Sequence, residues 1–311
     1  MVRFETLLNR VTRRAFSRSP VVADKLGLTA RSIGRTIDRF LETWMGKTGL
    51  IIILFFIFVA IYARLFIEYD RFETGIYERL QDFSWEHPFG TDQMGRDVLT
   101  RVAEGTEPSL IVGFAAMAIS MILGTIVGMA SGYAGGWKDE IIMRFNDMFL
   151  SIPWLVLMIV LAAVLESRSL WTVIIVIGIT GWSGTARIVR AQVLSLKERQ
   201  FVERARAIGA GDGHIISKHI FPNVVPLVFA NAILTIAICI LSEATLSFLK
   251  LGPDVETWGY VLSQAYEENV MLTGPYAYII MPGLCIVFVV LGFTFMGYAM
   301  DEVLNPKLRQ R

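Results

Sequence analysis

The sequence predicts an all-α, polytopic membrane protein with six transmembrane helices. Hydrophobic residues make up 54% of the chain and charged residues only 18%, and the apolar residues gather into runs close to the ~20 residues that a helix needs to cross a bilayer. Backbone polar groups in hydrocarbon must be hydrogen-bonded within the segment, so such runs form helices rather than single strands. The expected spans are 49–67, 109–133, 148–165, 170–186, 224–247 and 277–298.

These spans divide the chain into one membrane domain with soluble appendages. We expect a cytoplasmic segment at 1–48, a first transmembrane helix at 49–67, an extracytoplasmic loop at 68–108, a five-helix core at 109–300 with a polar loop at 197–222, and a tail at 301–311. Basic residues are retained on the cytoplasmic side of a membrane. With the N-terminus inside, the cytoplasmic segments hold 22 of the 29 Lys and Arg residues. Both termini and the polar loop are therefore expected in the cytoplasm of a cell-membrane protein.

The N-terminal segment carries its charge on one helical face. Arg31, Arg35 and Arg39 recur every fourth residue, while Ile37 and Trp44 mark a different face. This pattern is typical of an amphipathic helix that lies on a lipid surface. Nucleic-acid binding is the alternative explanation for the charge. Beside six spans, anionic lipid headgroups account for the same pattern, so we expect the bilayer as partner and no nucleic acid.

The extracytoplasmic loop contains a compact polar motif. Its members are Gly90, Thr91, Asp92, Gly95, Arg96 and Asp97. One interpretation is structural, because Thr91 or Asp92 can cap a helix that runs to about Glu104, and Arg96 can pair with a nearby carboxylate. The other is direct contact with a substrate. Charged residues ahead of a span usually anchor it, which favours the structural role.

The second span carries a row of small residues. Gly124, Gly128 and Gly132 fall at every fourth position, so they lie along one face of the helix. Such a row lets another helix approach closely, which is how membrane helices associate when lipid is as apolar as their side chains. We expect a packing seam, either within the subunit or against a second membrane subunit paired with it. Pro153, near the start of the third span, is either tolerated there or kinks the helix.

A polar cassette, 201–222, separates the fourth span from the fifth. An apolar helical face is predicted for Phe201, Val202, Ala205 and Ile208, with Glu203 on the polar side, so a short amphipathic helix is expected that could fill a groove on a partner. After it, three residues have expected roles in the chain path: Gly209 ends the helix, Asp212 caps a second one, and Pro222 begins the next span. The alternative interpretation is that the cassette only connects the two spans and contacts no partner protein.

The outer end of the fifth span holds an unusual charge. Glu243 is the one acidic residue inside the expected spans, and an isolated intramembrane carboxylate is by default a candidate functional residue. Its position toward the outer end favours a structural partner over a proton relay. The loop that follows contains Trp258 and Tyr266, and aromatic residues at this level are typical of an interfacial belt.

Two of these patterns resemble motifs of one family, the permease subunits of ABC importers. The cassette with Glu203, Ala205, Gly209 and Pro222 is similar to the cytoplasmic loop that docks on the ATPase in that family. The motif GTDQMGRD resembles that of the second permease of the pair in the dipeptide, oligopeptide and nickel group. The likeness covers about residues 45–305. The departures from the family pattern are Arg204 for alanine, His219 for isoleucine, Phe221 for leucine and Lys250 for glycine.

This resemblance implies a type I importer permease fold and a set of partners. They are a homologous second permease, two ATPase subunits and an extracytoplasmic solute-binding protein. The chain itself would hold no cofactor and no metal, since ATP and Mg would be bound by the ATPases. Di- or oligopeptides are the leading substrates, while nickel chelates, glutathione-like tripeptides and other small solutes remain open. Specificity in such systems resides largely in the binding protein.

The sequence offers no catalytic constellation of its own. A phosphate-binding loop would need glycine at the position of Leu41, ahead of Gly46, Lys47 and Thr48. None of the three histidines lies in an expected span, so an intramembrane protease site is excluded. An ion-coupled secondary transporter is the main alternative, but such carriers place ionisable groups near the midplane. A channel-like or purely structural membrane subunit is a third class, and it would account for the spans but for neither of the two polar motifs.

Overall fold

The computed structural model describes residues 34–67 and 74–304. Within these residues every regular element is helical, apart from one isolated β-bridge between Thr91 and Asp97. Residues 34–42 are helical and lead directly into the first span. The expectation of an amphipathic helix over residues 1–33 lies outside the described part of the chain.

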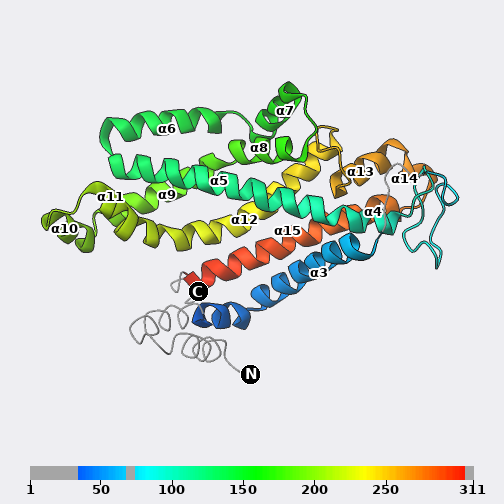
Figure 1. The fold of residues 1–311 in the computed structure, drawn as a ribbon, viewed down its shortest axis with the longest axis horizontal. Helices are drawn as coiled ribbons and strands as arrows, with labels where there is room; N and C mark the ends of the chain where they lie inside the picture. The colour runs from blue at the N-terminus through cyan, green and yellow to red at the C-terminus, as the bar shows by residue number, and fades with distance from the viewer. Residues whose placement is uncertain (1–33, 68–73, 305–311) are drawn as a thin grey trace.

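The helices run largely along one long axis (Figure 1). The first half comprises α3 (Trp44–Phe66), α4 (Val98–Glu104), α5 (Thr106–Ala134), α6 (Gly136–Ser151), α7 (Trp154–Leu165) and α8 (Leu170–Thr180). The second comprises α9 (Trp182–Lys197), α10 (Gln200–Ala207), α11 (Asp212–Ile215), a π-helical turn (Ile216–Ile220), α12 (Phe221–Phe248), α13 (Trp258–Glu267), α14 (Val270–Thr273) and α15 (Ala277–Leu304). The start of α3, the end of α15 and α10 gather at one end of the bundle, here called the α10 end, while α4, α13 and α14 form the opposite end.

The membrane-spanning elements agree with the expected fold class. Four single helices in the described residues are long and apolar enough to cross a bilayer, and six spans result when each of two bent pairs counts as one. The expected 148–165 span is divided between α6 and α7, which meet at 85°. Pro153 explains this break, because the residue before proline is excluded from the helical region and Ile152 adopts an extended conformation. The second pair, α8 and α9, bends by 40° at Gly181.

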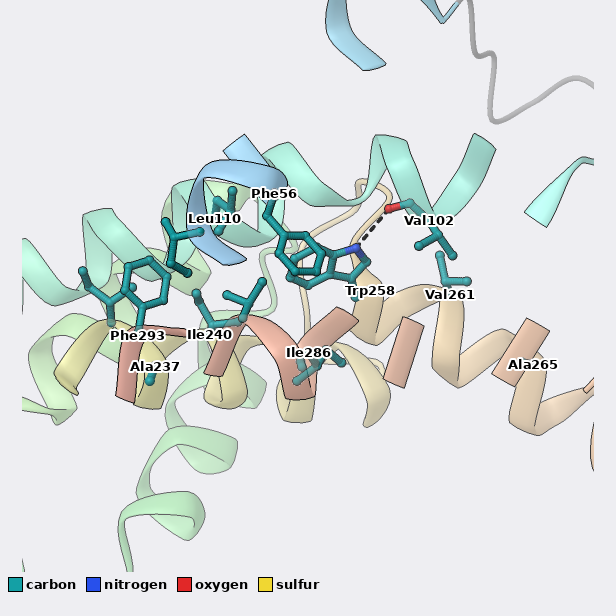
Figure 2. Packing of buried hydrophobic residues seen from close by; sticks show 14 of the residues in the cluster. Phe56, Val102, Leu110, Ala237, Ile240, Trp258, Val261, Ala265, Ile286 and Phe293 are labelled. Atoms are coloured by element: carbon teal, nitrogen blue, oxygen red, sulfur yellow. Dashed lines mark hydrogen bonds between the residues drawn. The ribbon is translucent and has the colours of Figure 1, made fainter. Parts of the chain in front are cut away.

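The core in the half of the bundle away from the α10 end is centred on Trp258. This side chain is fully buried, and its Nε1 donates a hydrogen bond to the Val102 carbonyl oxygen at 3.0 Å (Figure 2). Phe56 meets the indole edge-on, with ring centroids 5.4 Å apart. The expectation that Trp258 belongs to an interfacial belt is therefore wrong. Composition alone did not reveal that α13 folds back onto α4 and α3.

The glycine row of α5 is a seam within the subunit. A Cβ atom at Gly128 would lie 2.5 Å from the Ala186 carbonyl oxygen and 2.8 Å from the Val189 Cβ. The equivalent atoms at Gly124 and Gly132 would also meet α9 at less than 3.0 Å. Of the two interpretations that the sequence left open, the structure selects packing against α9. Because the glycines have no side chains, α9 can approach α5 closely along this face. Helix α9 then leads directly into the polar cassette.

Candidate functional site

Helix α10 is a short amphipathic rod that ends in a Schellman motif. Gly209 has a φ of 86°, a conformation that glycine adopts without the Cβ penalty of other residues. Its N–H donates to the Arg206 carbonyl at 3.0 Å, and the Ala210 N–H donates to the Ala205 carbonyl at 3.0 Å. These two bonds satisfy carbonyl groups at the end of the helix. Gly209 therefore provides the predicted stop and fixes the direction in which the chain leaves α10.

The apolar residues of α10 are divided between two environments. Val202 and Ala205 are buried against α9, α11 and the π-turn, in a cluster that includes Val193. Phe201 and Ile208, in contrast, are 40% and 86% exposed. The sequence interpretation placed Phe201, Val202, Ala205 and Ile208 on one partner-facing side, and the structure differs because Val202 and Ala205 face the subunit itself. The surface left open to a partner consists of Phe201, Ile208 and charged side chains, with Glu203 among them.

The chain returns to the membrane through a π-turn. Phe221 N–H bonds the Ile216 carbonyl, and Pro222 follows in the first turn of α12, as predicted. Proline has no N–H to donate and its ring crowds the preceding turn, so the wider π-turn accommodates it within a continuous helix. Asp212 does not cap α11, since Gly211 holds that position; instead its carboxylate accepts a hydrogen bond from Tyr133 at 2.5 Å. The second helix is thereby tied to the end of α5.

Ion pairs join α9 to the neighbouring α6. Arg190 makes a two-pronged contact with Asp139, with N–O distances of 2.7 and 2.6 Å. Ser131 of α5 donates to the same carboxylate. Two parallel N–H···O bonds of this kind fix orientation as well as distance. The base of α9 is therefore held against both α5 and α6 just before α10 begins, a link that no sequence pattern had indicated.

At the opposite end, the GTDQMGRD motif is folded as a tight loop. Gly90 and Gly95 both have a φ of 74°, and a Cβ at either would lie 2.3 Å from a backbone carbonyl of the preceding loop segment. Thr91 accepts a hydrogen bond from the Gln81 N–H at 2.8 Å and donates to the Glu78 carbonyl at 2.5 Å. The glycines and Thr91 thus hold two segments of the loop together, which explains why glycine and threonine suit these positions.

Asp92 and Arg96 belong to a buried network of charges. Asp92 accepts hydrogen bonds from Arg96 Nε at 2.7 Å and from Arg101 Nη1 at 2.8 Å. Arg101, fully buried, also donates to Glu256 at 3.1 Å and to the Tyr278 hydroxyl at 2.7 Å. Two arginines therefore face two loop carboxylates, Asp92 and Glu256. Because Arg96 also donates to Gln264 of α13, the network links the motif to α4, α13 and α15. Arg101 and its remote partners were missed by sequence reasoning, because nothing along the chain signals a contact across 155 residues.

Asp97 is the residue that caps α4. Its carboxylate accepts a hydrogen bond from the Thr100 N–H at 2.7 Å and contacts His87 Nδ1 at 3.0 Å. The expectation that Thr91 or Asp92 caps this helix is wrong, because both side chains are engaged inside the loop. The helix nevertheless ends at Glu104, as expected.

Glu243 lies fully buried on α12, near the end of that helix that is opposite α10. Its Oε1 accepts a hydrogen bond from Ser247 at 2.5 Å, while Oε2 has no hydrogen-bond partner within the described residues. Lys250, three residues beyond Ser247, stands just after the end of α12 with a φ of 63°. Its N–H and that of Leu251 close another Schellman motif, so a lysine occupies a position that favours glycine.

The described residues contain no group of three or more His, Cys, Asp or Glu side chains arranged to hold a metal ion. The two prominent polar assemblies are instead the α10 cassette at one end and the outer charge network at the other. One is exposed and the other buried, so the cassette is the better candidate for contact with another protein.

Comparison with known proteins decides the family. Residues 123–310 match the family described as binding-protein-dependent transport system inner membrane component. The chain belongs to this family. It is an integral membrane protein and a permease subunit of an ABC importer rather than an enzyme, since ATP hydrolysis belongs to separate subunits. Permeases of this family function in general with a partner permease, ATPases and a binding protein.

Individual relatives cover nearly the whole chain. It is 36% identical to the oligopeptide transport system permease protein OppC of Bacillus subtilis, over 93% of this chain and 94% of the relative. It is 39% identical to the dipeptide transport system permease protein DppC of Alkalihalophilus pseudofirmus, over 84% and 85%. It is 34% identical to the glutathione transport system permease protein GsiD of Pectobacterium atrosepticum, over 93% and 95%.

A solved structure supports the fold independently. An inward-facing structure of the MetNI methionine ABC transporter superposes with a TM-score of 0.53, at 19% identity, covering 66% of this chain and 96% of the matched one. At that identity the likeness concerns the fold alone. The predicted type I importer permease fold is confirmed.

Proposed function

We propose that this permease conducts di- or oligopeptides. The relatives named above carry oligopeptide, dipeptide and glutathione transport in their names, and all three substrate classes share an amide backbone with charged ends. A permease for nickel chelates or another small solute is the second candidate, because the GTDQMGRD motif also resembles that of nickel permeases.

The complex would contain four further polypeptides. A homologous second permease completes the translocation pathway, two ATPase subunits bind ATP and Mg, and an extracytoplasmic binding protein delivers the solute. The excess of Lys and Arg favours an orientation in which the α10 end and both termini face the cytoplasm. The outer charge network would then face the binding protein.

Helix α10 would transmit the movement of the ATPases to the membrane. Its buried side, Val202 and Ala205, shares one apolar cluster with α9 and α12, so a displacement of α10 acts on both spans at once. Closure of the ATPases around nucleotide would bias the bundle between two arrangements, with the pathway open to alternate sides. In this mechanism Phe201, Glu203 and Ile208 provide the contact surface, and Gly209 and Pro222 maintain its geometry.

The motif at the outer end would act as a scaffold rather than as a substrate contact. Asp92 and Arg96 are buried and satisfied by each other and by Arg101, so neither is free to bind a passing solute. Glu243 would likewise serve to hold α12 beneath the outer loops. An ion-coupled carrier is disfavoured, because its ionisable groups would lie near the midplane.

The experiment is peptide uptake and ATP hydrolysis by the full complex in proteoliposomes. Glu203→Lys reverses the charge of the exposed face, and Gly209→Pro imposes a negative φ on a position with φ of 86° while removing its N–H. Both variants are expected to lower uptake per ATP hydrolysed by at least about tenfold, equivalent to 1.4 kcal/mol of coupling, while the subunit still inserts.

A matched control lies two residues away. Gly211 has a φ of −73°, and a Cβ there meets nothing within 4 Å, so Gly211→Pro fits the backbone and is expected to leave coupling near wild type. Wild-type coupling in both Glu203→Lys and Gly209→Pro would remove the role assigned to the cassette.

A further inference from the structure

A recess opens at the corner between α9 and α10. Its volume is about 480 Å³, and it is lined by Leu196, Arg199, Gln200, Phe201 and Arg204. Leu196 is buried and forms an apolar wall, while the 40% exposed ring of Phe201 stands at the side. Both arginines are exposed. The recess therefore combines an apolar surface with two guanidinium groups within five residues of each other.

The charge of this recess is not neutralised by the subunit. No ion pair joins Arg199 or Arg204 to an acidic side chain within the described residues, in contrast to Arg187 and Arg190 on α9, which both have carboxylate partners. The N-terminus of α10 adds to the positive potential, since no side chain caps it. Guanidinium groups pair with carboxylates through a planar fork of donors, and they stack on apolar and aromatic surfaces. The recess thus fits a carboxylate side chain adjacent to an apolar one.

The position of the recess favours a protein over the membrane. Figure 1 shows α10 beyond the ends of α5 and α6, at the extreme tip of the molecule. Basic residues attract anionic lipid only within about a Debye length of the membrane surface. A recess beyond the ends of the spans is better placed to meet a soluble subunit.

We propose that the Arg199–Arg204 recess receives an acidic side chain of the ATPase subunit, and that Arg204 contributes to the choice of ATPase. The inference rests on the proposed docking of α10, and it adds the chemistry of the contact. It also gives a role to the exposed Arg204 guanidinium. A carboxylate held between two guanidinium groups selects partners by charge, because an uncharged or basic side chain would leave both arginines unpaired.

The test uses the complete transporter in detergent and removes the charges without changing the fold. In the double variant Arg199→Gln, Arg204→Gln, affinity for the ATPase subunits is expected to fall about tenfold, and its dependence on salt is expected to weaken. Lys218→Gln is the matched control, because Lys218 is an exposed cation of the same cassette that does not line the recess. That variant is expected to bind within about twofold of wild type.

A second measurement locates the contact directly. A photo-crosslinking amino acid in place of Arg204 is expected to attach to an Asp- or Glu-containing segment of the ATPase. Unchanged affinity in the double variant, or attachment to anionic lipid in proteoliposomes, would overturn the proposal. If Gly209→Pro still abolishes coupling in that case, docking of α10 stands and only the recess is wrong. If neither change has an effect, the proposed function of the cassette fails as well.

Discussion

The glycine seam between α5 and α9 permits a quantitative test, because a crowded glycine in the seam can be compared with an uncrowded glycine on α9. A Cβ at Gly128 would lie 2.5 Å from a backbone oxygen of α9 and 2.8 Å from the Val189 Cβ. Neither neighbour is the flexible end of a side chain, so the helices must move apart. A Cβ at Gly184, on α9 itself, meets nothing within 4 Å. Gly184→Ala is therefore the matched control for Gly128→Ala.

The two substitutions share one contribution and differ in another. Replacing a helical glycine by alanine gains up to about 1 kcal/mol of helix propensity in either case. At Gly128 the added methyl group also overpacks the seam, at a cost of roughly 1–3 kcal/mol. Gly128→Ala is thus expected to be less stable than Gly184→Ala by about that amount, and Gly128→Leu less stable still, with a reduced yield of assembled transporter.

Thermal unfolding of the purified subunit in detergent measures the difference. Gly128→Ala is expected to unfold at a lower temperature than Gly184→Ala. Equal unfolding temperatures, or a higher one for Gly128→Ala, would mean that the α5–α9 seam is looser than the structure indicates, and the close-approach argument would be refuted.

Two further predictions concern the outer end. Lys250→Gly is expected to raise stability by roughly 1 kcal/mol in the same unfolding assay, because it relieves a left-handed conformation that costs about 1–2 kcal/mol. The substitution loses only an exposed ion pair with Glu267. A lower stability of this variant would contradict the prediction. Arg101→Met is expected to lower stability by about 3–5 kcal/mol, since it leaves two buried carboxylates, Asp92 and Glu256, beside the single guanidinium of Arg96. Arg64→Met, at a 70% exposed pair, is expected to change stability by less than about 1 kcal/mol. Similar effects of the two arginine variants would show that burial does not govern the network.

Much of the fold could be predicted from sequence because lipid imposes simple rules. A long apolar run has few alternatives to a helix, and this constraint located the single-helix spans within a few residues. The stop at Gly209 and the proline in the first turn of α12 also followed from local backbone chemistry. Each of these features depends on residues close together in the chain.

The features that were missed depend on tertiary packing. Trp258 was assigned to an interfacial belt from its type and level, yet α13 folds inward and buries it against Phe56 and Val102. The cap of α4 was assigned to Thr91 or Asp92, but the loop engages both, so Asp97 serves instead. Likewise Ala205 was grouped with Phe201 as partner-facing, although tertiary packing turns it inward. In each case a correct local property had two possible partners, and tertiary packing made the choice. For Trp258 the deciding partners lie far away in sequence, whereas for the α4 cap and Ala205 they lie in neighbouring segments.

The buried polar groups of the bundle differ in how completely they are satisfied. At the outer end, Asp92 alone accepts four hydrogen bonds from backbone and guanidinium donors. Closer to the cassette, α6 and α9 bury Asn146 and Ser183, whose side-chain oxygen and nitrogen atoms have no hydrogen-bond partner within the described residues. An unsatisfied buried amide destabilises the packing that surrounds it by about 1–3 kcal/mol. These unsatisfied groups lower the stability of the α6–α9 packing around Asn146 and Ser183, whereas the ion pairs of Arg187 and Arg190 hold α9 to α6 closer to α10. In the proposed mechanism a force applied to α10 would therefore act first on the ion-paired base of α9, and only beyond it on the less completely satisfied packing.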